Sequence, residues 1–217
     1  INKGYQVSGS DMNESYLLDK LRNQGAKIFI GHSKEHISDD VDMVIYTAAV
    51  HEDNPEMIAT KEKNKLTMNR AAFLGQIMRE YKNSIAVSGT HGKTSVSTMV
   101  TLLLKESGID VGAFLGGISR NFDSNLLLPQ SATSLVVTEA DEYDRSFLQL
   151  HPSLAVITAI DADHLDIYGT YEAIVEAFGQ FVANVTEGGI VLYKQGINIQ
   201  PILSEGKKFL SYSIDHE

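Results

Sequence analysis

The sequence predicts an α/β fold in two parts: a Rossmann-like N-terminal domain at residues 1–83, and a P-loop-type domain with a mainly parallel sheet at residues 84–217. Short apolar runs alternate along the chain with segments of helical periodicity. This alternation is typical of parallel sheets that are covered by helices on both faces. In addition, a glycine-rich loop joins one apolar run to a helix, which is the layout of a phosphate-binding loop.

The first domain is expected to alternate strands and helices. Leucines with helical spacing before Gly25 and the N-terminal position of Pro55 predict two of its helices. The opening residues 1–4 resemble the end of a helix, so a further strand and helix are expected upstream. A polar break at residues 82–83 sets the predicted domain boundary. The predicted elements are strands at 5–7, 28–30 and 43–46, and helices at 15–23, 55–64 and 70–81.

The second domain is expected to begin with a strand at residues 84–87, followed by the glycine loop and a helix. Apolar residues from Val96 to Leu104 recur at helical spacing and support that helix. Residues 119–133 lack a periodic pattern and are expected to form an irregular loop. The other predicted elements are strands at 111–115, 134–138, 154–157, 190–192 and 209–211, and a helix at 170–184.

Composition narrows the class of protein. The 217 residues include 43% hydrophobic residues and carry a net charge of −10, which argues against a nucleic-acid-binding surface. There are no cysteines, so disulfides, thiolate metal sites and cysteine nucleophiles are excluded. The chain shows no apolar run of membrane-spanning length and no signal-peptide pattern at its first residues. Together these features predict a cytoplasmic protein without membrane insertion.

The stretch from Ser88 to Ser95 is the strongest motif in the chain. Its glycines let the backbone approach phosphate oxygens, and the following helix directs backbone N–H groups at the anion. Lys93 is placed to reach the β- and γ-phosphates, and the Thr94 hydroxyl is placed to bind Mg²⁺. The general pattern has a glycine where Val87 stands, so an ordinary glycine-rich turn with a solvated lysine is the alternative. The predicted nucleotide-binding residues are Gly89, Thr90, His91, Gly92, Lys93, Thr94 and Ser95.

Two further apolar runs end in reactive side chains. Residues 139–142 read Glu-Ala-Asp-Glu, and residues 161–164 read Asp-Ala-Asp-His. Parallel strands deliver their carboxyl ends to one edge of the sheet, so these residues are expected to converge on the phosphate loop. Glu139 is the preferred metal-binding acid because it comes first after its strand, and His164 is expected beside it. The alternatives are a solvated acidic loop and a structural histidine.

Three motifs in this order resemble the Mur ligases of peptidoglycan synthesis. They are Ser-Gly-Thr-His-Gly-Lys-Thr at 88–94, Glu-Ala-Asp-Glu at 139–142 and Asp-His-Leu-Asp-Ile-Tyr at 163–168. The first domain agrees through Gly-Tyr-x-Val-Ser-Gly-Ser-Asp at 4–11 and Asn-Pro-Glu at 54–56. Within the family, the pattern is most similar to the member that adds L-alanine to UDP-N-acetylmuramate.

The resemblance implies a three-domain protein in which this chain holds most of the UDP-binding domain and much of the central ATPase. The implied chemistry uses ATP to form an amide between UDP-N-acetylmuramate and L-alanine through an acyl phosphate. By motif, Lys93 stabilises the γ-phosphate, Thr94 holds one Mg²⁺, and Glu139 and His164 hold a second. Imidazole suits Mn²⁺, so Mn²⁺ is expected to replace Mg²⁺. The chain by itself is expected to form no amide, because a third domain would have to close over the site.

Three rival interpretations stay open at this point. The murein tripeptide recycling ligase of the same family shares Gly-Thr-His-Gly-Lys-Thr and the run Glu-Ala-Asp-Glu-Tyr-Asp at 139–144. The segment at 163–168 looks closer to the alanine-adding member. A folate polyglutamate ligase fits less well, because the N-terminal half resembles a UDP-binding domain. The third rival is a non-catalytic nucleotide-binding module.

Overall fold

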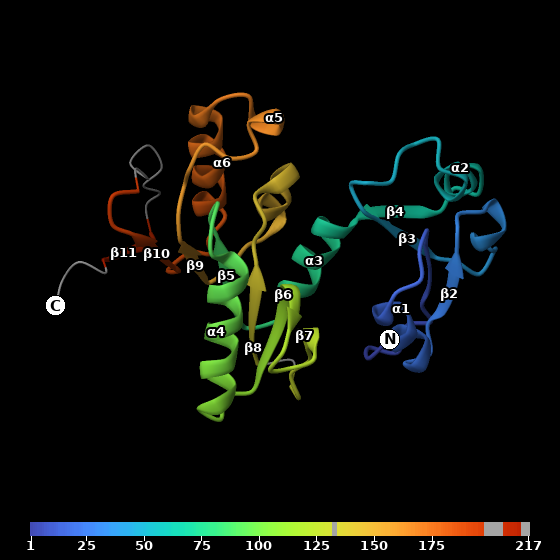
Figure 1. Ribbon diagram of the computed structural model, residues 1–217, viewed down its shortest axis with the longest axis horizontal. Coiled ribbons are helices and arrows are strands. Elements are labelled where there is room, and N and C mark those ends of the chain that lie inside the picture. Colours follow the sequence, from blue (N-terminus) through green and yellow to red (C-terminus); the bar gives the residue numbers. More distant parts are fainter. Residues whose placement is uncertain (132–133, 198–205, 214–217) are drawn as a thin grey trace. The chain divides into compact units, whose positions relative to one another are not determined.

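The computed structural model describes residues 1–131, 134–197 and 206–213. The chain forms two compact units, Ile1–Arg70 and Ala71–Glu217, and each is described by itself (Figure 1). Both units contain parallel strand pairs with helices between the strands, which confirms the predicted α/β class.

The division between the units lies at the start of helix α3 (Arg70–Met78), whereas the sequence suggests a boundary after residue 83. Helix α3 belongs to the second unit because its Met78 is buried in the core of that unit. Its Gly75 also lies against Gln149, so closely that a methyl group at Gly75 would meet the Gln149 carbonyl oxygen at 2.3 Å.

The first unit contains two separate pairs of parallel strands, β1 with β2 and β3 with β4. The side chain of Ser15 caps helix α1, and the side chain of Asn54 caps α2, which has Pro55 in its first turn. These caps confirm both predicted helix starts. The elements are β1 (Ser8–Asp11), α1 (Tyr16–Asn23), β2 (Lys27–Ile30), η1 (Lys34–His36), β3 (Met43–Tyr46), α2 (Pro55–Glu62) and β4 (Leu66–Asn69).

The predicted strand at residues 5–7 is wrong, because the observed β1 begins at Ser8. Its register is set by β2, with Ser8 opposite Lys27, and the Lys27 N–H donates to the Val7 carbonyl oxygen at 3.0 Å. Strand β4 was not predicted either. Partner strands in the tertiary structure thus decide these boundaries, and the apolar pattern of the segment itself does not.

The second unit is built on a seven-stranded sheet in the order β11-β10-β9-β5-β8-β6-β7. Every neighbouring pair is parallel except β6 with β7. Strand β5, which feeds the glycine loop, is central and lies between β8 and β9. The elements after α3 are β5 (Asn83–Ser88), α4 (Lys93–Glu106), β6 (Val111–Ser119), β7 (Ser124–Leu127), β8 (Leu135–Glu139), η2 (Tyr143–Gln149), β9 (Leu154–Ile157), α5 (Leu165–Tyr168), α6 (Tyr171–Ala183), β10 (Ile190–Lys194) and β11 (Lys208–Tyr212).

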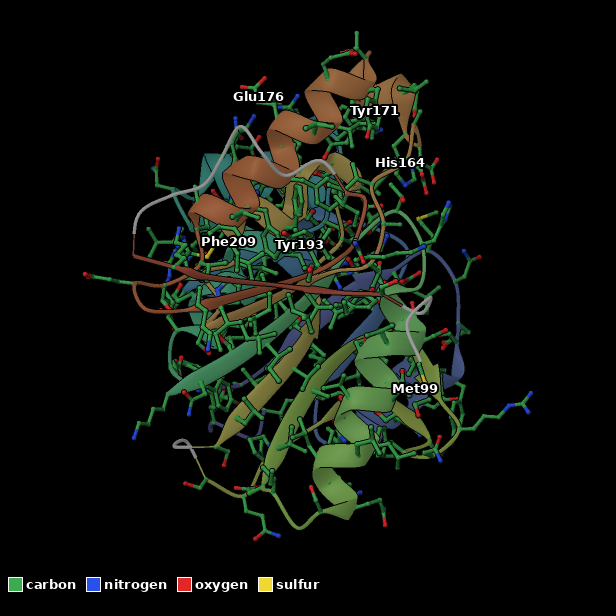
Figure 2. The ribbon with its side chains drawn as sticks, turned by 90° about the vertical axis from the view of Figure 1, so that its left-hand side faces the viewer. Met99, His164, Tyr171, Glu176, Tyr193 and Phe209 are labelled. Atoms are coloured by element: carbon green, nitrogen blue, oxygen red, sulfur yellow. The ribbon has the colours of Figure 1, made fainter. Side chains whose placement is uncertain are left out.

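Both faces of this sheet are covered, as its apolar strands predict. Successive residues of β8 belong to different clusters: Val136 packs with Phe178 and Phe181 of α6, and Val137 packs near Val100 of α4. Seen along the sheet, α6 and α4 lie on opposite sides of it (Figure 2). This two-sided burial holds the central strands rigidly and fixes where their carboxyl ends lie.

The prediction of an irregular loop at 119–133 is wrong in part, because strand β7 lies within that segment. Residues 132–133 lie outside the described part. Strand β6 runs on to Ser119 and pairs antiparallel with β7, with Phe114 opposite Leu126. The short helix α5 was not predicted, and at four residues it offers no periodicity to detect. Within the described residues, none of the helices combines the length and the apolar character that a membrane span requires.

Candidate active site

The glycine loop runs from β5 into helix α4, as the sequence predicts. Gly89 has a φ of +133°, and a side chain there would meet Thr158 Oγ1 at 2.1 Å and Ala159 N at 2.8 Å. Gly92 has a φ of +84° at the N-cap of α4, where no side chain caps the helix. Lys93 is therefore the first residue of α4, whose N-terminal N–H groups are open to an anion.

The segment that follows β9 holds this loop in place. Thr90 N donates to the Ala159 carbonyl oxygen at 3.1 Å, and Asp161 N donates to Thr90 Oγ1 at 3.2 Å. The hydroxyl of Thr158 donates to the Ser88 carbonyl oxygen at 3.1 Å and also contacts the His91 carbonyl oxygen. The predicted convergence of Asp161 on the loop is therefore present, and its role there is to anchor Thr90.

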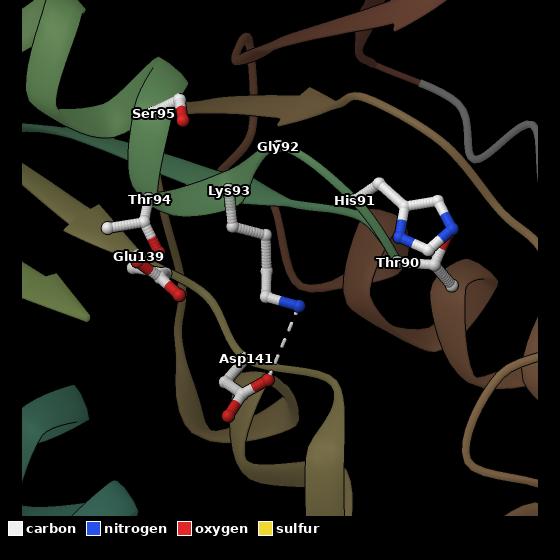
Figure 3. A pocket seen from close by; sticks show the side chains of 8 residues that line it. All are labelled: Thr90, His91, Gly92, Lys93, Thr94, Ser95, Glu139 and Asp141. Atoms are coloured by element: carbon white, nitrogen blue, oxygen red, sulfur yellow. Dashed lines mark ion pairs between the residues drawn. The ribbon is translucent and has the colours of Figure 1, made fainter. Parts of the chain in front are cut away.

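A pocket of about 430 Å³ lies over the loop (Figure 3). Glu139 reaches it because β8 pairs with β5 in a register that sets Glu139 opposite Val87, just before the loop begins. One carboxylate oxygen of Glu139 accepts the Gly116 N–H at 3.0 Å, which fixes the side chain at the pocket wall. The lining residues are Thr90, His91, Gly92, Lys93, Thr94, Ser95, Glu139 and Asp141.

Lys93 is paired with an acid that the sequence reasoning did not select. Its ammonium donates to both carboxylate oxygens of Glu142, at 2.9 and 2.8 Å, and to the Gly89 carbonyl oxygen at 3.0 Å. The Glu142 side chain is only 1% exposed. The Asp141 carboxylate lies further away, at 3.5 Å, and its side chain is 55% exposed. Nothing in an acidic run such as 139–142 indicates which member is buried, so only the structure reveals Glu142.

His164 lies beside Glu142. Its Nε2 is 3.7 Å from Glu142 Oε1, and its Nδ1 is 3.8 Å from Asp163 Oδ1. The sequence predicts Glu139 as its neighbour, but the carboxylates that the structure places near its ring are those of Glu142 and Asp163. His164 also has a left-handed backbone with a φ of 54°, which is uncommon outside glycine. His91, by contrast, is exposed and faces Asp161 at 3.5 Å.

Tyr168 holds the main chain of Glu142. Its hydroxyl donates to the Glu142 carbonyl oxygen at 2.6 Å, and the side chain is buried. Burial raises the pKa of Tyr168 to about 12, and the nearby Arg145 guanidinium only partly opposes that rise. The phenol therefore stays protonated, as a donor, at every ordinary pH.

The pocket residues suit a magnesium–polyphosphate ligand. Thr94 and Glu139 offer oxygen atoms, which are the donors that Mg²⁺ prefers. Among the described residues, no three His, Asp or Glu side chains gather into a complete metal-ligand group.

The glycine loop opens helix α4 at the carboxyl edge of a parallel sheet, and the strand beside β5 in that sheet ends in a carboxylate. These features define the phosphate-loop class of α/β domains. Comparison with protein families agrees. The model for the Mur ligase family catalytic domain matches residues 1–82, and the model for the Mur ligase middle domain matches residues 87–217. The chain belongs to the Mur ligase family, which confirms the resemblance seen in its motifs.

Two relatives within the family are named for the same ligase reaction. The chain is 43% identical over 213 residues to UDP-N-acetylmuramate–L-alanine ligase of Clostridium botulinum, which covers 97% of this chain and 46% of that protein. The structure of UDP-N-acetylmuramate–alanine ligase from Thermotoga maritima matches with a TM-score of 0.83 and 29% identity, over 99% of this chain and 48% of that one. The chain thus spans about half the length of these relatives.

A third match concerns the fold alone. UDP-N-acetylmuramate:L-alanyl-γ-D-glutamyl-meso-diaminopimelate ligase from Neisseria has a TM-score of 0.86 at 23% identity, over 98% of this chain and 71% of that one. Identity at this level shows that the architecture is shared. It does not distinguish the amino acid or peptide that each protein uses.

Proposed function

We propose that the protein acts in an ATP-dependent ligase reaction that joins L-alanine to UDP-N-acetylmuramate. The observation that carries the proposal is the pocket at the carboxyl edge of the sheet, where Lys93 and Thr94 of the helix start meet Glu139 of the adjacent strand. The named relatives at 43% and 29% identity support the choice of substrates.

The proposed reaction has two steps. The lactyl carboxylate of UDP-N-acetylmuramate takes the γ-phosphoryl group of ATP, which gives ADP and an acyl phosphate. The amine of L-alanine then attacks the acyl carbon, and phosphate leaves as the amide forms. Both steps demand that the protein position the reactants and neutralise charge on the transferring group. In this proposal, Lys93 and the N–H groups at the start of α4 stabilise the phosphates.

The charges around the pocket support the proposal that the nucleotide binds together with a cation. Glu139 and Asp141 line the pocket, and Lys93, which is the one lysine or arginine among its described lining residues, is already paired with Glu142. Free polyphosphate would be repelled by the carboxylates, and bound Mg²⁺ supplies the positive charge that offsets this repulsion.

Three residues are proposed as ligands of magnesium. Thr94 would hold one Mg²⁺ through its hydroxyl oxygen, and Glu139 and His164 are proposed to hold a second ion through a carboxylate oxygen and a ring nitrogen. A nitrogen ligand suits Mn²⁺ better than it suits Mg²⁺, so Mn²⁺ should replace Mg²⁺ in the reaction.

The test uses the three-domain protein that the family resemblance implies, because the chain by itself is expected to form no amide. It measures phosphate release from ATP with UDP-N-acetylmuramate and L-alanine each left out in turn. Lys93→Ala should lower turnover by about 10²–10³-fold, because it removes a cation aimed at the transferring group. Lys105→Ala is the matched control, since Lys105 lies in the last turn of the same helix and contacts the Phe122 ring instead. Turnover that survives Lys93→Ala, or that needs neither substrate, would contradict the proposal. Phosphate release with a tripeptide in place of L-alanine would instead support the tripeptide recycling ligase activity.

A further inference from the structure

All three N–H bonds of the Lys93 ammonium group have acceptors within the protein. A lysine ammonium has three N–H bonds. In this structure its acceptors are the Gly89 carbonyl oxygen and the two oxygens of Glu142, all within 3.0 Å. The Lys93 side chain is also largely enclosed, at 13% exposure. A phosphate oxygen can therefore bind this ammonium only if one of the existing bonds is given up.

The main chain at Glu142 is anchored, and its side chain is buried. Its main-chain carbonyl is held by the Tyr168 hydroxyl at 2.6 Å. The two residues after Tyr143, Asp144 and Arg145, have left-handed φ values of 52° and 61°, a conformation that non-glycine residues adopt only when their surroundings impose it. The chain thus turns sharply after Glu142 and keeps its carboxylate inside the protein.

We propose that Glu142 is an internal counter-ion that occupies Lys93 in place of a phosphate oxygen and thereby limits the affinity of the pocket for nucleotide. This inference rests on the proposed function, because it assigns a competitor for the same lysine. Glu142 is a positioning residue: it acts on the nucleotide through Lys93 and does not line the pocket.

The exchange is feasible because it leaves no buried charge without a partner. Glu142 holds Lys93 with two oxygens, so it can release one N–H to phosphate and keep another. A buried carboxylate that lost its cation entirely would be strongly unfavourable. Lys93 is therefore expected to bridge Glu142 and the nucleotide when the pocket is occupied.

The primary test is calorimetric titration of the protein with ATP, with and without Mg²⁺, in wild type and Glu142→Gln. Glutamine keeps the shape and accepts one hydrogen bond, but it removes the competing charge. We expect ATP to bind Glu142→Gln about tenfold more tightly, a change of about 1.4 kcal/mol. If the ion pair is purely structural, Glu142→Gln should lower the melting temperature and leave ATP binding unchanged or weaker. That result would overturn the proposal.

Asp141→Asn is the matched control. It removes the same charge from the next residue, and its carboxylate lies 3.5 Å from the same ammonium without a hydrogen bond that meets normal geometry. A gain in Glu142→Gln that is less than threefold larger than the gain in Asp141→Asn would show a general field effect and would overturn the specific competition. A gain in Glu142→Gln at least threefold larger than in Asp141→Asn supports it.

A double-mutant cycle with Lys93→Met tests whether the effect passes through Lys93. In that background, Glu142→Gln should no longer tighten ATP binding, and a gain that persists would overturn the proposal. If Glu142→Gln does not fold, Glu142→Asp replaces it: the shorter acid can hold only one N–H, so binding should tighten about threefold, and unchanged or weaker binding counts against the proposal. Failure of folded wild type to bind ATP at all would refute the proposed function instead, so the two failures are distinguishable.

Discussion

Gly116→Ala tests whether the position of Glu139 matters for the bound cation. A β-carbon at Gly116 would lie 2.3 Å from Glu139 Oε2 and 2.5 Å from its carboxyl carbon. Ordinary contact begins near 3.4 Å, so the carboxylate must retreat by about 1 Å. That shift also breaks the 3.0 Å hydrogen bond from the Gly116 N–H.

The effect on stability should be small. The lost hydrogen bond is solvent-exposed and contributes about 0.5–1.5 kcal/mol. Replacing glycine by alanine at a compatible backbone returns about 0.4–1 kcal/mol through the unfolded state. The free energy of unfolding in urea should therefore change by no more than about 1 kcal/mol. The effect on catalysis should be large, because a displacement of about 1 Å at a reacting centre can cost about 10²-fold.

Gly117→Ala is the control, since its added methyl group would meet only the Thr94 methyl at 3.7 Å. Both variants should be compared by urea unfolding and by the Mg²⁺ dependence of phosphate release. Gly116→Ala should need more Mg²⁺ and turn over more slowly, and Gly117→Ala should match wild type. Equal Mg²⁺ dependence in the two folded variants would refute a metal-binding role for Glu139.

Two further variants test the structure around the loop. Ser88 Oγ is buried without a hydrogen-bond partner in the described part of the chain. Ser88→Ala should therefore leave the free energy of unfolding in urea unchanged or raise it by about 1 kcal/mol. A decrease of more than about 1 kcal/mol would show that the hydroxyl has a hydrogen-bond partner after all. Tyr168→Phe removes the donor to the Glu142 carbonyl oxygen and should lower the free energy of unfolding in urea by about 1–2 kcal/mol. An unchanged urea midpoint would mean that this hydrogen bond does not hold Glu142 in place.

Local sequence signals predicted most of the second unit because those signals act over a few residues. An apolar run, two glycines and a helical pattern are enough to place β5, the loop and α4, and the glycines at 89 and 92 do adopt the positive φ that the loop requires. The position of Glu139 was predictable for the same reason: it is the last residue of a buried parallel strand, and such strands end at one edge.

Elements that depend on a distant partner were not predictable. Strand β1 has the polar sequence Ser-Gly-Ser-Asp and becomes a strand only by pairing with β2. Strands β4 and β7 likewise form against β3 and β6. In each case hydrogen bonds to another segment outweigh the weak preference of the local residues.

The sequence by itself determined the family, the phosphate loop and the acid at the end of β8, because these depend on residue type at fixed spacing. The tertiary structure alone decided that Glu142, and not another member of the acidic run, is buried against Lys93, and that His164 lies beside Glu142. Burial depends on the path that the chain takes after β8, where Asp144 and Arg145 turn in left-handed conformations. No periodicity or motif encodes that turn, so the partner of the loop lysine became visible only in three dimensions.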